Sequence, residues 1–418
     1  MGLKPGYKET DLGPLPSDWT TAKLEEVGLV INGLTYAPSD VRSYGTLVLR
    51  SSNIQNDALA FEDNVFVDME IPERIMVRPD DVLICVRNGS RILIGKTALL
   101  DERTIGMAFG AFMAVFRSDH GRYVNYLFRS HIMKRQIDEH LGATINQITN
   151  KSLKSFQIPV PPTDDEIDAI ATALSDADAL LDGLDRLIAK KRDLKQAAMQ
   201  QLLTGETRLP GFEGEWEMKR LGDVGVFLKG SGVRKDEAQS GDLPCIRYGE
   251  IYTHHNDYVL SYNSWISPAV ASTAVRLKKG DILFAGSGET KDEIGKCVAF
   301  IDDCEAYAGG DIVILRPHEA DPIFMGYYCN TAPVRKQKAS KGQGDAVVHI
   351  SASALSSIEV QVPSLPEQAA ISSTLSDMDA EIAALEQRRN KTKNMKQAMM
   401  QELLTGKTRL VTPGGSNA

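Results

Sequence analysis

A long internal repeat constrains the architecture of this chain more than any other feature of its sequence. The segment KQAAMQQLLTGETRL at residues 195–209 returns as KQAMMQELLTGKTRL at residues 396–410, with three of fifteen positions changed. Aligned without a gap, residues 171–209 and 372–410 are identical at 19 of 39 positions. Self-similarity at a fixed spacing indicates that one structural unit has been duplicated. We therefore expect two copies of the same fold within the 418 residues.

The repeat extends backwards from these segments through the rest of the chain. The stretch around Trp19 parallels the stretch around Trp216, RPDDVLICV matches KKGDILFAG, and ITNKSLKSFQIPVPP matches ISASALSSIEVQVPS. Short apolar runs bounded by Gly, Pro and Asp predict strands in each copy, and NYLFRSHIMKRQIDEHL predicts a helix. We therefore predict a mixed module at 1–162, a helix at 163–209, a second mixed module at 210–364, and a second helix with a tail at 365–418.

Apolar residues recur in steps of three and four along both helical segments, a pattern typical of a coiled-coil seam. The two segments are long and match in length, which favours packing of one helix on the other. Packing of each helix on its own module is the alternative. The seam turns polar after its midpoint and resumes with residues that include Leu194 and Met395, and Gly205 and Gly406 are placed to end the helices. The residues predicted to form the seam are Leu174, Leu181, Leu184, Leu202, Leu375, Ile382, Leu385 and Leu403.

Composition narrows the class of protein. A hydrophobic content of 42% and a charged content of 25% are typical of a soluble globular protein. The first residues lack the apolar core of a secretion signal, and no apolar run is long enough to predict a membrane span. The five cysteines form no CxxC pair, which indicates reduced thiols and a cytoplasmic protein.

Charge neither supports nor excludes a nucleic-acid partner. The formal net charge is -9, whereas nucleic-acid binding usually leaves a basic footprint. Residues 1–162 are close to neutral, however, with 18 Lys and Arg against 19 Asp and Glu. A nearly neutral module can still gather its cations on one face.

No motif in the sequence assembles a catalytic centre. In GSRILIGKT, Gly89 precedes Gly95 by six positions, whereas a phosphate-binding loop needs five. His254 and His255 lack further ligands at metal-binding spacing, and a glycine-rich cofactor fingerprint is missing. We therefore predict a non-catalytic chain that has neither a metal site nor a cofactor of its own.

Two polar loops at corresponding places in the modules are the candidate binding sites. They are RNGSRILIGK in the first module and GSGETKDEIGK in the second. Lys and Arg suit phosphate groups, and Arg or Asn can read base edges in the major groove. The loops differ between modules whereas the helices nearly match, which favours a common frame that reads two different targets. Solvated loops without a ligand are the alternative. The predicted DNA-binding residues are Arg87, Asn88, Arg91, Lys96, Ser287, Thr290, Lys291 and Lys296, and later basic stretches (Arg129, Lys134, Arg135; Arg335, Lys336, Lys338, Lys341) are candidates for further phosphate contacts.

Several of these segments carry a family likeness. The opening GYKETDLGPLPSDW, the helix end LLTGxTRL followed by PGFEGEW, and the helix start PxxxEQxAI resemble the specificity subunit of type I restriction–modification enzymes. The likeness spans essentially the whole chain. It implies an α+β fold in which two mixed α/β target recognition domains each read half of a split DNA sequence. It also implies that the two long helices form an antiparallel coiled coil with pseudo-two-fold symmetry.

The resemblance also implies partners. In that family the helices dock two methyltransferase subunits, which use S-adenosylmethionine to methylate adenine, and restriction subunits that translocate and cleave DNA join them. The expected partners are therefore double-stranded DNA and these subunits, with no membrane. One departure is that the first helix begins PPTDDEIDAI, without the Pro and Gln of PSLPEQAAI. The rival interpretation is a non-catalytic coiled-coil scaffold that binds proteins and has no DNA specificity.

Overall fold

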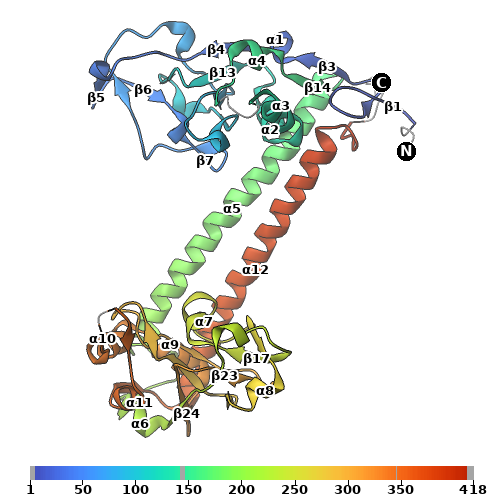
Figure 1. Cartoon of the computed structure of the whole chain (residues 1–418). Coiled ribbons are helices and arrows are strands. Elements are labelled where there is room, and N and C mark those ends of the chain that lie inside the picture. The colour runs from blue at the N-terminus through green and yellow to red at the C-terminus, as the bar shows by residue number, and fades with distance from the viewer. Residues whose placement is uncertain (1–4, 142–145, 345, 412–418) are drawn as a thin grey trace. The chain divides into compact units, whose positions relative to one another are not determined.

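The computed structural model describes residues 5–141, 146–344 and 346–411, and the chain divides into two compact units (Figure 1). Unit one contains residues 1–185 and 387–418, and unit two contains residues 186–386. The division cuts through both long helices, so each unit contains one mixed module and a part of each helix. Residues 412–418, at the end of the helix and tail predicted for 365–418, lie outside the described residues.

Two small sheets and a layer of helices make up the mixed module of unit one. The central sheet is antiparallel, in the order β11-β10-β13-β4, and the second sheet has the order β12-β6-β9-β5. β10 is buried along its whole length, because one face of the central sheet packs on the second sheet and the other on the helices. Its sequence is therefore continuously apolar instead of alternating. The elements are β3 (Thr20–Lys23), β4 (Leu29–Asn32), β5 (Val41–Arg42), β6 (Thr46–Leu49), β9 (Phe66–Val67), β10 (Val82–Cys85), β11 (Thr97–Leu99), β12 (Ala108–Phe109), β13 (Met113–Arg117), α2 (Gly121–Arg129), α3 (His131–Leu141), α4 (Asn150–Ser155) and β14 (Gln157–Val160).

Unit two repeats the central sheet of unit one strand by strand, whereas its second sheet has its extra edge strand at the opposite side, β19 beside β23 in place of β5 beside β9. Its central sheet has the order β16-β24-β20-β22, and its second sheet has the order β18-β17-β23-β19. In both units the strand after the central helices pairs with the strand that follows the tryptophan, β14 with β3 and β26 with β15. The predicted repeat is therefore a repeat of the fold. The elements are β15 (Glu217–Arg220), β16 (Gly225–Lys229), β17 (Leu243–Ile246), β18 (Ser264–Ile266), β19 (Val275–Arg276), β20 (Ile282–Ala285), β21 (Ser287–Gly288), β22 (Cys297–Ala299), β23 (Tyr307–Ala308), β24 (Ile312–Pro317), α9 (Pro322–Tyr328), α10 (Ala332–Lys341), β25 (Val348–His349), α11 (Ala352–Ser356) and β26 (Glu359–Val362).

The single helix predicted over NYLFRSHIMKRQIDEHL is two helices, so that prediction was wrong. Ser130 separates α2 from α3 with an extended backbone (φ -82°, ψ 165°), and its hydroxyl donates a hydrogen bond to the carbonyl of Leu127. A serine side chain that bonds to the preceding turn competes with continuation of the helix. Unit two has the same break between α9 and α10, where Pro333 lies in the first turn of α10.

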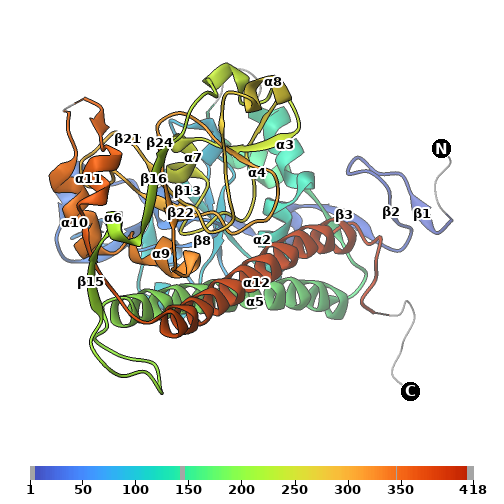
Figure 2. The ribbon, with the colours of Figure 1, turned by 90° about the horizontal axis from the view of Figure 1, so that it is seen from below.

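The long helices are α5 (Asp164–Leu202) and α12 (Leu365–Leu403), and they pair antiparallel (Figures 1 and 2). In unit one, the beginning of α5 lies beside the end of α12, and Lys396 donates a hydrogen bond to Asp178. In unit two, the end of α5 lies beside the beginning of α12, and Lys195 Nζ is 2.6 Å from Asp379 Oδ1. The two ion pairs occupy corresponding positions of the repeat.

Six of the eight predicted seam residues are buried, and two are half-buried. Leu194 and Met395 are 47% and 53% exposed, so their placement in the seam was wrong. The next residue in each helix is the lysine that pairs with an aspartate of the other helix. Because neighbouring residues on a helix point in different directions, the inward lysine turns the preceding apolar residue outward. The buried residues are Leu174, Leu184, Leu202, Leu375, Ile382 and Leu403, and the half-buried ones are Leu181 and Leu385.

The long helices pack both on each other and on the mixed modules. In unit one, Ile170 and Leu174 at the beginning of α5 share a core with Leu403 of α12 and with the helices of the module. In unit two, Leu375 of α12 shares a core with Leu202 of α5 and with its own module. The two packing modes that the sequence left open are therefore both present. Each helix begins in the core of a module and covers the end of the other helix there.

The duplicated helix ends contact the beginning of the opposite helix. In unit one, Gly406 adopts a left-handed conformation (φ 63°), and the chain then passes over Trp19. The guanidinium of Arg409 lies 5.9 Å from the Trp19 ring centroid and binds the fully buried carboxylate of Glu166 through two hydrogen bonds. Because α5 begins just before Glu166, this pair ties the end of α12 to the start of α5. We call these four residues the collar of unit one.

Unit two has the same collar. Gly205 has a φ of 73°, the guanidinium of Arg208 lies 5.9 Å from the Trp216 ring centroid, and Arg208 Nη2 is 2.6 Å from Glu367 Oε2. Glu166 and Glu367 align in the repeat. The missing Pro and Gln at the start of the first helix therefore leave the collar intact. The chain carries the same helix end twice because it builds the same collar twice.

Candidate nucleic-acid interface

The predicted residues Arg87 and Asn88 are the second and third residues of the loop from β10 to β11. The guanidinium carbon of Arg87 lies 5.1 Å from the ring centroid of Phe112, and both side chains are exposed. The amide nitrogen of Asn88 donates to Ser51 Oγ at 3.1 Å, and its amide oxygen accepts from the backbone of Ser90 at 2.9 Å. Asn88 therefore fixes the shape of the loop, and Arg87 extends from its second position.

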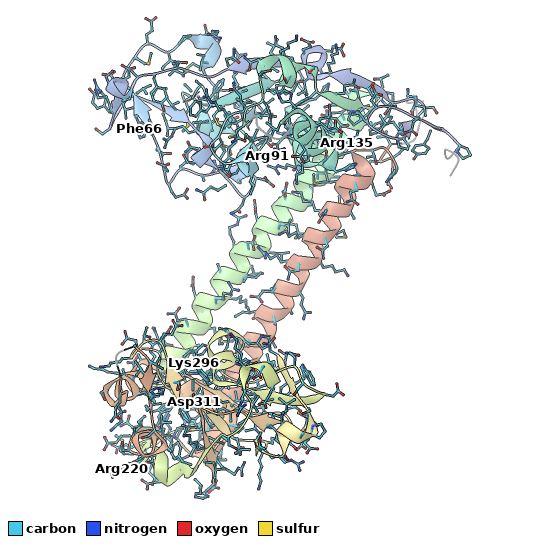
Figure 3. The ribbon with its side chains drawn as sticks, in the orientation of Figure 1. Phe66, Arg91, Arg135, Arg220, Lys296 and Asp311 are labelled. Atoms are coloured by element: carbon cyan, nitrogen blue, oxygen red, sulfur yellow. The ribbon has the colours of Figure 1, made fainter. Side chains whose placement is uncertain are left out.

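The same loop closes one side of a basic pocket in unit one. The pocket has a volume of about 440 Å³ and brings together four cations from two parts of the sequence. The predicted residues Arg91 and Lys96 come from the loop, and Arg129 and Lys134 come from α2 and α3 (Figure 3 labels Arg91 beside these helices). The lining residues are Asp57, Arg91, Ile92, Ile94, Gly95, Lys96, Thr97, Phe128, Arg129, Lys134, Ile137, Asp138 and Leu141.

Two polar groups of this pocket are buried without a hydrogen-bond partner among the described residues. They are Nε of Arg129 and Oγ1 of Thr97. The rest of the Arg129 guanidinium is engaged, because Nη2 donates to the carbonyl of Asp57 and Nη1 lies 3.7 Å from Asp178 Oδ2. A buried donor without an acceptor is costly, so a ligand that brings acceptor oxygens is favoured there. Phosphate oxygens accept hydrogen bonds, and the negative charge of a phosphate would balance the positive charge of the four cations.

Unit two has a corresponding pocket of about 410 Å³. Gly95 and Lys96 correspond to Gly295 and Lys296, and Lys134 corresponds to Arg335 by the offset of the repeat. The lining residues are Lys195, Tyr252, Asn256, Asp257, Glu293, Lys296, Asn330, Arg335 and Lys338. Each pocket therefore has four cations, and two of the four stand at corresponding positions of the repeat.

Three of the cations in the pocket of unit two are directed into the protein. Lys296 Nζ donates to the carbonyl of His255 at 2.8 Å, and Lys338 Nζ donates to the carbonyl of Gly295 at 2.6 Å. Burial lowers the pKa of Lys296 and of Lys338 below their ordinary value. Lys195 is held by Asp379. Arg335, in contrast, is exposed.

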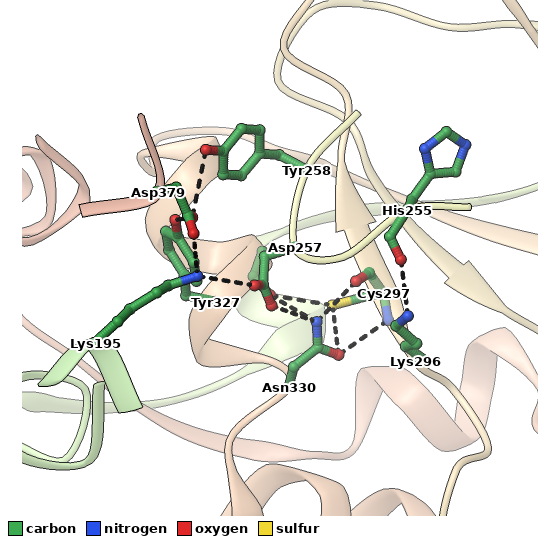
Figure 4. Close-up of polar contacts among 10 residues, drawn as sticks. Lys195, His255, Asp257, Tyr258, Lys296, Cys297, Tyr327, Asn330 and Asp379 are labelled. Atoms are coloured by element: carbon green, nitrogen blue, oxygen red, sulfur yellow. Dashed lines mark hydrogen bonds and ion pairs between the residues drawn. The ribbon is translucent and has the colours of Figure 1, made fainter. Parts of the chain in front are cut away.

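A polar network behind this pocket joins α5, α9 and α12 to the loop before β18 (Figure 4). Lys195 Nζ lies 3.9 Å from Asp257 Oδ2, and Asn330 Nδ2 donates to Asp257 Oδ1 at 3.2 Å. The hydroxyl groups of Tyr258 and Tyr327 both donate to Asp379. Burial raises the pKa of Asp257. Each polar group here is used by another residue of the chain, so the network holds the module on the helices.

The structure places the other predicted residues of unit two in different environments. Ser287 lies in β21 and is buried, and its hydroxyl is 2.8 Å from His349 Nδ1 in the paired strand β25. Thr290 donates to Glu293 Oε2 at 3.3 Å, and Lys291 is exposed on the loop. Of this set, only Lys291 presents an exposed cation. Ser287 is positioned to support the loop instead of contacting a ligand directly.

Phe112 was missed by the sequence reasoning. It precedes the buried strand β13, and in the sequence it reads as one more apolar residue of AFMAVF. It is nevertheless 57% exposed. The sequence feature that could have indicated this exposure is the position of Phe112 directly after Gly110 and Ala111. Arg87 lies at the same end of the sheet.

Within 5–141, 146–344 and 346–411, no group of three or more His, Cys, Asp or Glu side chains is arranged to hold a metal ion. None of the helices in these ranges has the length and apolar character that crossing a bilayer requires.

Comparison with known proteins gives one family and a consistent set of relatives. The family model described as the type I restriction modification DNA specificity domain matches twice, at residues 16–190 and 213–394. The MjaVIII type I restriction enzyme specificity subunit of Methanocaldococcus jannaschii is 22% identical over 97% of this chain and 96% of its own length. The EcoKI specificity subunit of Escherichia coli K12 is 24% identical over 68% of this chain and 65% of its own length.

A solved structure has the same fold. The crystal structure of the type I restriction-modification system S subunit from M. genitalium covers 96% of this chain and 98% of its own, with a TM-score of 0.58 and 15% identity. At that identity the likeness supports the fold, including two mixed modules and two long helices, and does not transfer individual residues.

Proposed function

Because the chain belongs to the type I restriction modification DNA specificity family, we propose that each of its two units reads one half of a divided DNA target. The chain is the DNA specificity subunit of a type I restriction–modification system and is itself non-catalytic. This membership decides between the two functions that the sequence left open, in favour of DNA recognition over a scaffold without DNA specificity. The double match of the family model, once per mixed module, supports one reader per unit.

The single observation that carries the site assignment is the basic pocket of unit one. Arg91, Lys96, Arg129 and Lys134 line this pocket, in which Nε of Arg129 and Oγ1 of Thr97 lack hydrogen-bond partners among the described residues. Contacts to phosphates fix the register of a protein on the duplex, and contacts to base edges give sequence choice. We assign the pocket to phosphates and the exposed Arg87, which belongs to the same loop as Arg91 and Lys96, to bases. In unit two, the corresponding assignment is Arg335 at the pocket and Lys291 on the loop.

We further propose that two methyltransferase subunits dock near the two collars, with the restriction subunits joining that assembly. The chain is a subunit of a type I restriction–modification complex. The support for two equal docking places is the near identity of residues 195–209 and 396–410, together with the matching contacts of Arg208 and Arg409. The system would act in the cytoplasm, where the five cysteines, all free, stay reduced.

The proposed function is tested by binding and methylation with the partner subunits present. The complex should methylate only those DNA molecules that contain both halves of one sequence. Removal of either half should abolish methylation. Unselective methylation, or a requirement for only one half, would contradict a reader in each unit. The chain alone, incubated with DNA and labelled S-adenosylmethionine, should transfer no methyl group.

A further inference from the structure

Arg87 differs from the other arginines that contact aromatic rings in unit one. Within the described residues it has no carboxylate in ion-pair distance, although its guanidinium lies over Phe112. Arg103 provides the contrast, because it also lies over a ring, 5.5 Å from the Phe61 centroid. Its Nε and Nη2 are bound by Asp101 at 3.0 Å and 2.8 Å. The donor fork of Arg103 is occupied, and that of Arg87 is available.

The backbone around Arg87 is fixed. The amide groups of Val86 and Arg87 both donate to the carbonyl of Phe112, at 3.0 Å and 3.1 Å. Arg87 also forms an antiparallel bridge with Gln147. The side chain therefore starts from a fixed point at the end of the central sheet, and the ring of Phe112 limits the directions in which its guanidinium can point. An arginine that is held in this way loses little conformational entropy when it binds.

We propose that Arg87, held over Phe112, reads a guanine in the half of the DNA target bound by unit one. The inference rests on the proposed function of unit one as a DNA reader. The O6 and N7 atoms of guanine are two acceptors that match the two parallel donors of a guanidinium in the major groove. The exposed ring of Phe112 supports the guanidinium from one side and excludes water there. Phe112 is thus a positioning residue for Arg87.

Unit two has different residues at the corresponding places. Gly286 donates to the carbonyl of Asp311 as Val86 does to that of Phe112, so Ser287 corresponds to Arg87 and Asp311 to Phe112. Ser287 is buried against His349, and Asp311 is exposed with a φ of 60°. A carboxylate repels phosphate and cannot donate to guanine. The guanine requirement that we assign to Arg87 should therefore be absent from the half-site of unit two.

The experiment measures methylation by the complete complex on a DNA library in which every position of both half-sites is varied. For Arg87→Ala we expect the preference for one G·C pair to fall about tenfold or more, with the other positions unchanged. Arg87→Lys should lose most of that preference as well, because it keeps the charge but not the fork. Phe112→Ala should relax the same position to a smaller extent. Arg103→Ala is the matched control and should behave as the wild type.

The possible outcomes separate the inference from the function on which it rests. A uniform loss at all sequences would make Arg87 a phosphate contact and overturn the guanine assignment. An unchanged preference would overturn it as well, as would relaxation in the half-site that unit two reads. The second half-site reports on folding, because a misfolded variant loses both. If the wild type has no sequence preference in the library, the proposed function itself fails, and the inference fails with it.

Discussion

Units one and two share their frame down to single hydrogen bonds and differ in what they place at the ends of their central sheets. The side chain of Gln136 exchanges two hydrogen bonds with the backbone of Gln157, and Gln337 does the same with Glu359. Arg117 binds Asp81 as Arg316 binds Asp281. These contacts join strands and helices of the frame. Substitution of one partner would leave the other, a buried or half-buried charge or amide, without its ion-pair or hydrogen-bond partner.

The pockets show the opposite behaviour. At corresponding positions, Ile137 of unit one is a hydrophobic core residue, whereas Lys338 of unit two is a buried cation that donates to a backbone carbonyl. Asn330 of unit two stands at the position of Arg129 of unit one, and Ser287 stands at the position of Arg87. The frame therefore requires particular pairs of residues, whereas the pocket positions tolerate different residues. Residues that make no contact required by the frame are therefore the ones that can vary to recognise different DNA sequences.

The largest expected effect is the loss of stability when the tryptophan of a collar is replaced, and this loss should differ between the two units. Trp19 is completely buried, whereas Trp216 is only half-buried. Trp19→Ala should cost unit one about 3–5 kcal/mol of unfolding free energy, because it leaves a large cavity in the core. Trp216→Ala should cost unit two clearly less. Hydrogen exchange resolved by segment measures each unit separately, and equal losses would contradict the difference in burial.

Acid should weaken unit two through His255. Burial lowers the pKa of His255 to about 4, below its ordinary value of 6.5. Between these values the unfolded chain binds a proton that the folded unit does not, so the contribution is fully present above pH 6.5 and is lost as the pH falls towards 4. We expect about 1–2 kcal/mol after allowance for partial solvent access.

The check is the unfolding free energy of unit two at neutral and acidic pH, for the wild type and for His255→Gln. The variant should lose less stability on acidification, because glutamine binds no proton in this range. Unit one has Gln55 at the corresponding place and provides the internal reference. An equal acid response in the wild type and the variant would show that His255 does not titrate as its burial requires.

The smallest expected effect is the loss of a single phosphate contact, which changes the salt dependence of DNA binding. Lys134→Ala and Arg335→Ala each remove an exposed cation at the pocket of one unit, so each should reduce the slope of log affinity against log salt by about 1. Lys338→Met removes an equal charge that is buried and bonded to Gly295, so it should leave the slope unchanged. Equal slopes for all three variants would mean that exposure does not decide which cations contact DNA.

Much of the fold could be predicted from the sequence because the chain contains two copies of the same module. Strand patterns, the two long helices and Gly205 and Gly406 as their terminators could each be checked against a second copy. The errors lie where a polar side chain overrides the apolar pattern. Ser130 ends a helix through its own hydroxyl, and Lys195 turns inward to Asp379, which pushes Leu194 outward. Neither effect is visible in periodicity alone.

The candidate site could be predicted only in part. Loop composition pointed to Arg87 and Arg91, but burial decides whether a polar residue is available, and the sequence does not report it. Ser287 appeared equivalent to a surface donor and is instead buried against His349. Phe112 appeared to be a strand residue and is exposed. The assignment of the eight predicted residues to DNA contact stays a prediction.

If each unit reads its own half of the target, exchange of one module should change one half-site alone. Residues 210–362 would be replaced by the corresponding module of a relative, and methylated adenines would be mapped in DNA exposed to the complete complex. We expect a target in which one half-site is new and the other is retained, because the frame contacts of unit one are untouched. A target in which both halves change, or in which neither changes while the protein remains folded, would contradict it.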